Sequence, residues 1–409
     1  MKAGAGKARI NLDGVLPFDG FDVELDSLWV RTVLVEAENR CCIVSVEATS
    51  LRADVVEPLR ALVAREAICA PELVWITVTH TFSSPHVRTP EHLANDGECK
   101  RNALLRARLE EATRIAVRQA LETLAESTLS VGRSTTTCNV NRDVETPAGW
   151  WLGHNPHGYS DKSLQGICLC RIDTGEPIAL LFTADVQSSV LDKARDSQGN
   201  KVVSGDLAGR ASTIAEKSLP GCVALFLTGA AADQAPLQQA VTVTVDAAGN
   251  VTQHDQGNGR ELLDMLGERF AAELLDTLAY MVPVPCDAVS GDVYAVRLPG
   301  QQRGNFHSLR PQRAYTYAPA ADEETSVSIL RWGDVVLVGT EPELSSSFGT
   351  QVRALAPHVV LATLVNGAKK YLPSSDAYDR VTYEAMNSSF GQGSDTVLFQ
   401  AISSAIANE

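Results

Sequence analysis

Four polar side chains stand directly after apolar, strand-like runs of the sequence. His80 follows LVWITVT, Asp185 follows IALLFTA, Glu341 follows VVLVGT, and Tyr371 follows VVLATLVNGAKK. In α/β proteins the strand ends converge on one edge, where loops build the site. One histidine, two carboxylates and a phenol would form a site suited to zinc, manganese or iron. The alternative is that each is an ordinary polar residue at the end of a strand.

Arg142 is a further candidate, because it lies in NVNRD after a threonine-rich, strand-like run. A fixed guanidinium there would grip a carboxylate or a carbonyl oxygen of a substrate; the alternative is a surface ion pair. The segment WWLGHNPHGY, residues 150–159, places His154 and His157 beside aromatic rings. It either lines a substrate pocket or packs as a loop. The sequence has no G-x-S-x-G elbow and no H-E-x-x-H pair, so nothing supports a serine or cysteine nucleophile.

The elements that must position these residues alternate between strands and helices. We expect strands at residues 28–35, 41–46, 73–78, 165–172, 177–182, 223–227, 327–332, 335–339 and 359–365. We expect helices at residues 52–66, 102–127, 206–218, 259–280 and 344–355. This mixture predicts an α/β fold, with mixed sheets flanked by helices. Residues 246–259 read as a hairpin plus a loop, and residues 299–322 as one long loop.

Composition limits the partners. The chain has 409 residues and a net charge of −15, which argues against a nucleic-acid partner and against anionic membranes. We find neither a signal peptide nor an uninterrupted apolar run of transmembrane length. The nine cysteines are scattered, and Cys168 and Cys170 form C-x-C in a strand-like run, which indicates half-buried thiols rather than a metal site. A reduced, cytoplasmic protein that acts on a small molecule fits best, and the oligomeric state stays open.

The order of several short motifs resembles the catalytic domain of the neutral/alkaline non-lysosomal ceramidase superfamily. The similar stretches run in order through the chain: GAGKARINLDG, VTHTFSSP, NVNRD, FTADVQSSVL, VVSGDLAG, LFLTGAAADQAP, VGTEPELSSSFG and VNGAKKYLPSSDAYDRVTYE. Each motif alone is weak, but their order and spacing cover nearly the whole chain. The resemblance implies one catalytic domain over residues 1–409, without the C-terminal immunoglobulin-like domain of the full ceramidases.

The resemblance also implies one divalent metal ion. In that family two histidines, a glutamate and a tyrosine hold zinc. The first histidine matches His80, the glutamate matches Glu341, and the tyrosine matches Tyr371, five residues after Asn366. The second histidine falls on Asp185, which makes the predicted site harder and richer in oxygen. Zinc is therefore the first candidate, with iron or manganese as alternatives.

Two further departures concern the chemistry. Phe82 stands where the family has a histidine beside the substrate, and Ala235 stands where ceramidases carry a serine. Arg142 matches an active-site arginine of the family. The general base is not evident without the histidine that Phe82 replaces, so His86, His307 or a free carboxylate are the candidates.

Three functions are compatible with these residues. The first is a metal-dependent enzyme that hydrolyses an amide or related C–N bond of a small molecule, not of ceramide, in which the metal activates water. The second keeps the metal, and iron above all, for an oxygenase, lyase or cyclase of a biosynthetic pathway. The third is a non-catalytic relative that keeps the fold as a binding protein.

Overall fold

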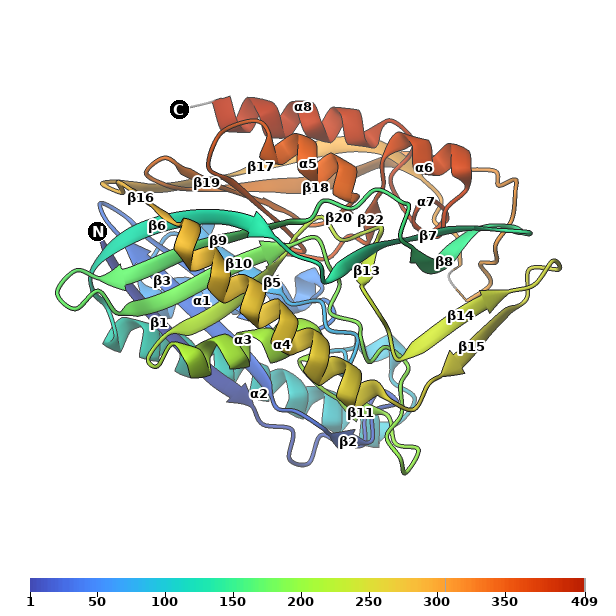
Figure 1. The fold of residues 1–409 in the computed structure, drawn as a ribbon, viewed down its shortest axis with the longest axis horizontal. Coiled ribbons are helices and arrows are strands. Elements are labelled where there is room, and N and C mark those ends of the chain that lie inside the picture. Colours follow the sequence, from blue (N-terminus) through green and yellow to red (C-terminus); the bar gives the residue numbers. More distant parts are fainter. Residues whose placement is uncertain (306, 408–409) are drawn as a thin grey trace.

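The computed structural model of the chain describes residues 1–305 and 307–407. Two β-sheets lie face to face, and helices cover the outer face of each (Figure 1). The predicted α/β class, with mixed sheets flanked by helices, is confirmed.

The large sheet carries the N-terminal part of the chain. Its strands lie in the order β12 (Val223–Thr228), β10 (Pro177–Ala184), β9 (Ser163–Arg171), β6 (Ala125–Thr135), β1 (Lys2–Ile10), β3 (Leu28–Glu36), β4 (Arg40–Val46) and β5 (Val74–Val78), with β16 (Val282–Val284) paired to β6. The helices on its outer face are α1 (Ala53–Ala67), α2 (Asp96–Glu122), α3 (Asp206–Ser218) and α4 (Gly259–Thr277). Strand β3 is largely apolar because both of its faces are covered. Val30 and Leu34 pack beneath helices, and Val33 and Val35 face the second sheet.

The second sheet consists of β17 (Val289–Gln301), β18 (Pro319–Trp332), β19 (Val335–Thr340) and β21 (Val359–Thr363). Its outer face packs against α5 (Ser346–Arg353) and α8 (Ser394–Ala407). Between the two sheets, Trp75 and Trp332 are fully buried. Burying large apolar side chains of this kind stabilises the fold by roughly 1.5–3 kcal/mol each.

The smaller β-elements surround one end of the two large sheets (Figure 1). They are the three-stranded sheet of β13 (Gln234–Pro236), β7 (Asn139–Thr146) and β8 (Gly149–Asn155), the hairpin of β14 (Val241–Val245) and β15 (Val251–Asp255), and the pairs β20 (Glu343–Leu344) with β22 (Tyr371–Leu372) and β2 (Val23–Glu24) with β11 (Val202–Val203). The short helices are α6 (Ser375–Arg380), α7 (Tyr383–Met386) and the 3-10 turns η1 (Pro71–Leu73), η2 (Pro90–His92) and η3 (Leu278–Tyr280).

Most predicted elements are present, with some corrections. The helix predicted at residues 102–127 is α2, which begins six residues earlier and ends at Glu122, before β6 starts at Ala125. Arg142 lies within strand β7 rather than after a strand. The predicted hairpin is β14–β15, and the predicted long loop is real but shorter, between Gln301 and Pro319. Within the described residues, no helix is both long enough and apolar enough to cross a membrane.

Candidate functional site

The strand ends of both sheets meet where the predicted site residues lie. The hydroxyl of Thr228, at the end of β12, donates to the carbonyl of Val78 at the end of β5, over 2.8 Å. Thr363, at the end of β21, donates to the carbonyl of Gly229 over 2.8 Å. These bonds tie three strand ends from two sheets together, so residues distant in the sequence share one polar region.

The backbone leaving these strands adopts left-handed conformations. His80 has φ 57°, and Leu364, Asn366 and Lys370 have φ between 56° and 58°. Such conformations cost about 1–2 kcal/mol for residues with a Cβ, and they cluster at functional sites. Asn366 explains part of the arrangement, because its side-chain oxygen accepts a hydrogen bond from the backbone N–H of Ile76 on the edge strand β5, over 2.8 Å.

His80 is buried and fixed by the backbone. Its Nδ1 lies 2.5 Å from the carbonyl oxygen of Thr49, which can only accept, so Nδ1 carries a proton. Its Nε2 lies 3.0 Å from Oε2 of Glu343 but makes no hydrogen bond of acceptable geometry. The imidazole is thus oriented from one side and paired with a carboxylate on the other.

The carboxylate beside His80 is Glu343, not the predicted Glu341. Strand β20 pairs with β22 so that Glu343 lies opposite Tyr371. Glu341 instead accepts hydrogen bonds from the hydroxyl of Thr325 and the N–H of Ser326, each over 2.9 Å. The sequence contains the relevant signal in Glu341-Pro342-Glu343, since either glutamate fits the motif, but only the folded chain distinguishes them.

A chain of contacts connects Glu343 to Arg142. Gln187 donates from Nε2 to Glu343 over 3.0 Å, and its Oε1 accepts from Nη1 of Arg142 over 2.7 Å. Nε of Arg142 donates to Glu384 over 2.8 Å. We call His80, Arg142, Gln187, Glu343 and Glu384 the Arg142 cluster. Gln187 and Glu384 were not among the predicted site residues, although both lie in motifs of the resemblance.

The charged groups of the Arg142 cluster shift one another's pKa so that they stay ionised although they are buried. Burial acts to raise the pKa of Glu343, but His80, Arg142 and Lys370 together outweigh it, so the net pKa is lowered. Burial acts to lower the pKa of Arg142, but Glu384 raises it. Both groups therefore stay ionised in a buried place, where an unpaired charge would be costly.

Tyr371 lies against Arg142. Its ring centroid is 5.4 Å from the guanidinium carbon, and the ring of Tyr383 makes an edge contact with it at 6.1 Å. Burial raises the pKa of the Tyr371 phenol, so the hydroxyl keeps its proton and is available as a hydrogen-bond donor.

Asp185 belongs to a second group of charges. Its oxygens accept from Nη2 of Arg353 over 2.6 Å and from Nη1 over 3.0 Å. The guanidinium also binds Asp161 over 2.8 Å. We call Asp161, Asp185 and Arg353 the Arg353 cluster. Burial raises the pKa of Asp185; in Asp161 burial acts the same way, but Arg353 and further donors bring the pKa down to about 2.

Asp233 lies between the two clusters. Its backbone oxygen accepts from the N–H of Arg142, and its Oδ1 accepts from the N–H of Ser346, both over 2.9 Å. Burial raises its pKa to about 6. Burial and Glu384 likewise raise the pKa of the neighbouring Asp143.

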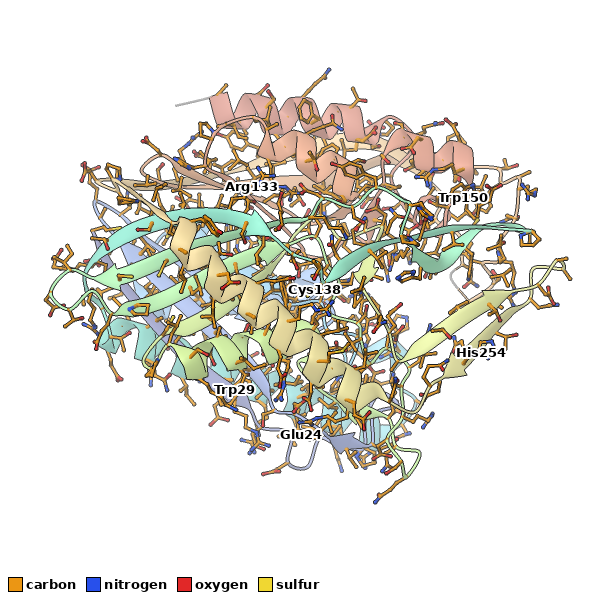
Figure 2. All side chains as sticks on the ribbon, viewed as in Figure 1. Glu24, Trp29, Arg133, Cys138, Trp150 and His254 are labelled. Carbon is orange, nitrogen blue, oxygen red and sulfur yellow. The ribbon has the colours of Figure 1, made fainter. Side chains whose placement is uncertain are left out.

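A cavity of about 830 Å³ opens onto the Arg142 cluster. Arg142, Gln187, Tyr371 and Tyr383 contribute polar groups to its lining. Its other walls come from β8, from the segment after β13, and from the β14–β15 hairpin. Trp150 and His254, labelled in Figure 2, mark β8 and β15, two of these elements. A cavity of this size, lined by both apolar and polar side chains, suits a small molecule.

Phe82 separates the cavity from His80. The two rings make an edge contact, with centroids 4.8 Å apart and planes inclined at 67°. Phe82 lines the cavity, whereas His80 and Glu343 are not among the residues that line it.

The two predicted candidates for the general base lie elsewhere. Nδ1 of His86 lies 2.7 Å from Asp19, and neither His86 nor the exposed His307 lines the cavity. Neither side chain therefore contacts the space in which a molecule would bind, and a role as general base stays a prediction for both. His154 on β8 does line the cavity. It belongs to the aromatic segment at residues 150–159, for which the sequence predicted either a pocket wall or a packed loop.

These residues do not fit the predicted metal site. The structure does not bring His80, Asp185, Glu341 and Tyr371 together, because Asp185 is bound by Arg353 and Glu341 by β18. Among the described residues, no group of three or more His, Cys, Asp and Glu side chains is placed to hold a metal ion. Of the described His, Cys, Asp and Glu side chains only His80 and Glu343 lie together here, one fewer than the three protein ligands usual for catalytic zinc. Tyr371 lies opposite Glu343, and its ring packs against the guanidinium of Arg142.

Solved structures share this fold. The neutral ceramidase from Pseudomonas aeruginosa matches 99% of this chain and 74% of its own, with a TM-score of 0.75 and 16% identity. A ceramidase complexed with C2 gives a TM-score of 0.71 and 14% identity over the same shares of the two chains. No protein-family model and no curated protein sequence matches the chain. The resemblance seen in the sequence is therefore confirmed at the level of the fold: this chain has a neutral-ceramidase-like α/β fold.

Proposed function

We propose that the chain is a hydrolase that acts on an amide or related C–N bond of a small molecule bound in the cavity. The observation that carries the proposal is the position of Arg142 and Tyr371, two fixed donors in the wall of the cavity. The fold shared with ceramidases supports the reaction class. No step is assigned to a metal ion, because the predicted ligands are not assembled.

The donors suit a carbonyl oxygen. Arg142 and Tyr371 would hold that oxygen and stabilise the negative charge that develops on it as water adds to the carbonyl carbon. Glu384 and Gln187 keep the guanidinium in place before the substrate arrives. Because Glu384 already balances the charge of Arg142, the site favours a neutral amide over a free carboxylate.

We assign the proton transfer to His154 because it is the histidine in the lining of the cavity. As the water oxygen bonds to the carbonyl carbon, the imidazole would take a proton from that water. It would return the proton to the nitrogen as the C–N bond breaks, which releases an amine and a carboxylic acid.

The substrate is proposed to differ from ceramide. Ala235 lines the cavity at the position where the resemblance has a serine, and Phe82 lines it where the resemblance has a histidine. Both changes remove a polar group from the place where the reaction would occur.

A second candidate is a binding protein that uses the same cavity without catalysis. The observation that favours it is Phe82, whose ring makes an edge contact with His80 and lines the cavity where His80 does not. The metal-dependent oxygenase, lyase and cyclase alternatives depend on a ligand set that the structure does not bring together.

Incubation with a panel of small N-acyl amides, lactams and one ceramide, with detection of the released amine, tests the proposal. We expect amine release from a small amide, none from ceramide, and a large loss in His154→Ala. His157→Ala is the matched control, because His157 is exposed on the same segment and does not line the cavity. Panel members that raise the melting temperature without any amine release would support the binding protein instead.

A further inference from the structure

Asp185 has no free coordination site on either oxygen. Its Oδ1 accepts from Nη1 of Arg353 and from the N–H of Ala230, and its Oδ2 accepts from Nη2 of Arg353 and the hydroxyl of Ser346. These contacts span 2.6–3.0 Å, the usual range for charge-assisted hydrogen bonds. A metal ion could bind this carboxylate only by displacing the guanidinium.

The guanidinium is held as firmly as the carboxylate. The Arg353 side chain is 4% exposed and binds Asp161 from the other side. Arg353 lies on α5, which begins two residues after β20, the strand that carries Glu343. The same short segment therefore supplies the carboxylate of one cluster and the buried cation of the other.

We propose that Arg353 has replaced a metal ion as the buried cation bound by Asp185, and that the native chain holds no metal at His80. The sequence resemblance places a zinc-binding histidine at position 185, and the structure shows an aspartate with a fixed arginine there. Carboxylate and guanidinium form a complete pair, which leaves His80 and Glu343 with too few partners to hold an ion. The inference concerns metal binding and stands apart from the proposed reaction.

Equilibrium dialysis of the folded native chain against zinc chloride, followed by elemental analysis, tests whether the native chain holds a metal ion at His80. We expect no zinc retained near stoichiometry and no difference between the native chain and His80→Ala. Stoichiometric zinc in the native chain that is lost in His80→Ala would overturn the proposal. Both outcomes are read from binding, so they do not depend on finding a substrate.

The double variant Asp185→His with Arg353→Gln tests whether Arg353 has taken the place of the metal ion. The introduced imidazole restores the nitrogen ligand, and Asp161 keeps its hydrogen bonds from Ser163 and Thr350. We expect this variant to bind stoichiometric zinc and to lose it when His80→Ala is added. A double variant that has native circular dichroism but binds no zinc would overturn the claim that the Asp185–Arg353 pair is what excludes the ion.

Discussion

The Arg142 cluster and the Arg353 cluster are both buried and charged, yet they differ in how completely their polar atoms are bonded. In the Arg142 cluster, Nε2 of His80, Nη2 of Arg142 and Oε2 of Glu384 make no hydrogen bond of acceptable geometry, although each lies in a charged pair or network. None of the three residues of the Arg353 cluster has such an atom. Buried polar groups are usually satisfied, so incomplete bonding beside a cavity points to a functional site and complete bonding to a structural one.

The largest expected effect is on stability, in the Arg353 cluster. Arg353→Met leaves Asp185 as an uncompensated buried charge, which costs about 3–5 kcal/mol of the free energy of unfolding. Urea denaturation measures the loss. Arg297→Met is the matched control, because its ion pair with Glu324 is exposed and should change stability by less than about 1 kcal/mol. Equal losses in both variants would mean that the Arg353 cluster is not the structural one.

The next effect is on activity, in the Arg142 cluster. Arg142→Lys keeps the charge but loses the planar fork that holds Glu384, Gln187 and the substrate oxygen together. We expect kcat/KM for the amide found in the panel to fall by about 10²–10³-fold. Arg133→Lys is the control, because Arg133 binds Ser163 and does not line the cavity. An Arg142→Lys enzyme with undiminished kcat/KM would separate the cluster from catalysis.

The pH dependence of stability should follow the raised pKa of Asp233. An acid whose pKa is higher in the folded state contributes stability that is present below the unfolded pKa and is lost as the pH rises through the folded pKa. For Asp233 that window runs from 3.8 to about 6, and the loss is up to about 3 kcal/mol. Asp233→Asn should therefore flatten the fall in the free energy of unfolding between pH 4 and pH 6.5.

Asp161 supplies the opposite case and the control. Its pKa is lowered to about 2, so its contribution is present above 3.8 and is lost as the pH falls toward 2. Asp161→Asn should leave the slope between pH 4 and pH 6.5 unchanged, whatever it does to overall stability. If Asp233→Asn also leaves the slope unchanged, the buried Asp233 does not titrate in that window.

The smallest effect concerns the barrier between the cavity and His80. Phe82→Ala removes the ring that covers the imidazole, so His80 should react faster with diethyl pyrocarbonate, as read by mass spectrometry of its peptide. His154 is exposed in both proteins and serves as the internal reference. Equal labelling of His80 in the two proteins would show that Phe82 does not shield it.

The fold was largely predictable because its central strands are buried on both faces. Runs such as residues 41–46 and 335–339 are almost entirely apolar, and they appear as β4 and β19. Strand β17 was missed because its residues alternate between exposed and buried positions, which weakens the apolar signal. Asn366 accepts a hydrogen bond from Ile76 on the edge strand β5, which lies almost three hundred residues earlier. No local sequence pattern predicts a contact between residues so far apart.

The proximity of some predicted residues could be inferred from the sequence, but their partners could not. Strand ends and motif order pointed to His80, Arg142 and Tyr371, and contacts through Glu343 and Gln187 connect them in the structure, while their roles stay predictions. Glu343 was missed because Glu341 has the same side chain two residues earlier, and only the register of β20 against β22 decides between them. The partner of Asp185 was not visible, because Arg353 lies 168 residues away on a helix of the other sheet.

Crystals of the native chain grown or soaked with zinc, with anomalous diffraction recorded at the zinc edge, test the central claim most directly. The account predicts no anomalous peak beside His80 and Glu343, with Asp185 still bound by Arg353. A zinc peak within bonding distance of His80 and Glu343, with the Arg353 guanidinium displaced from Asp185, would contradict it.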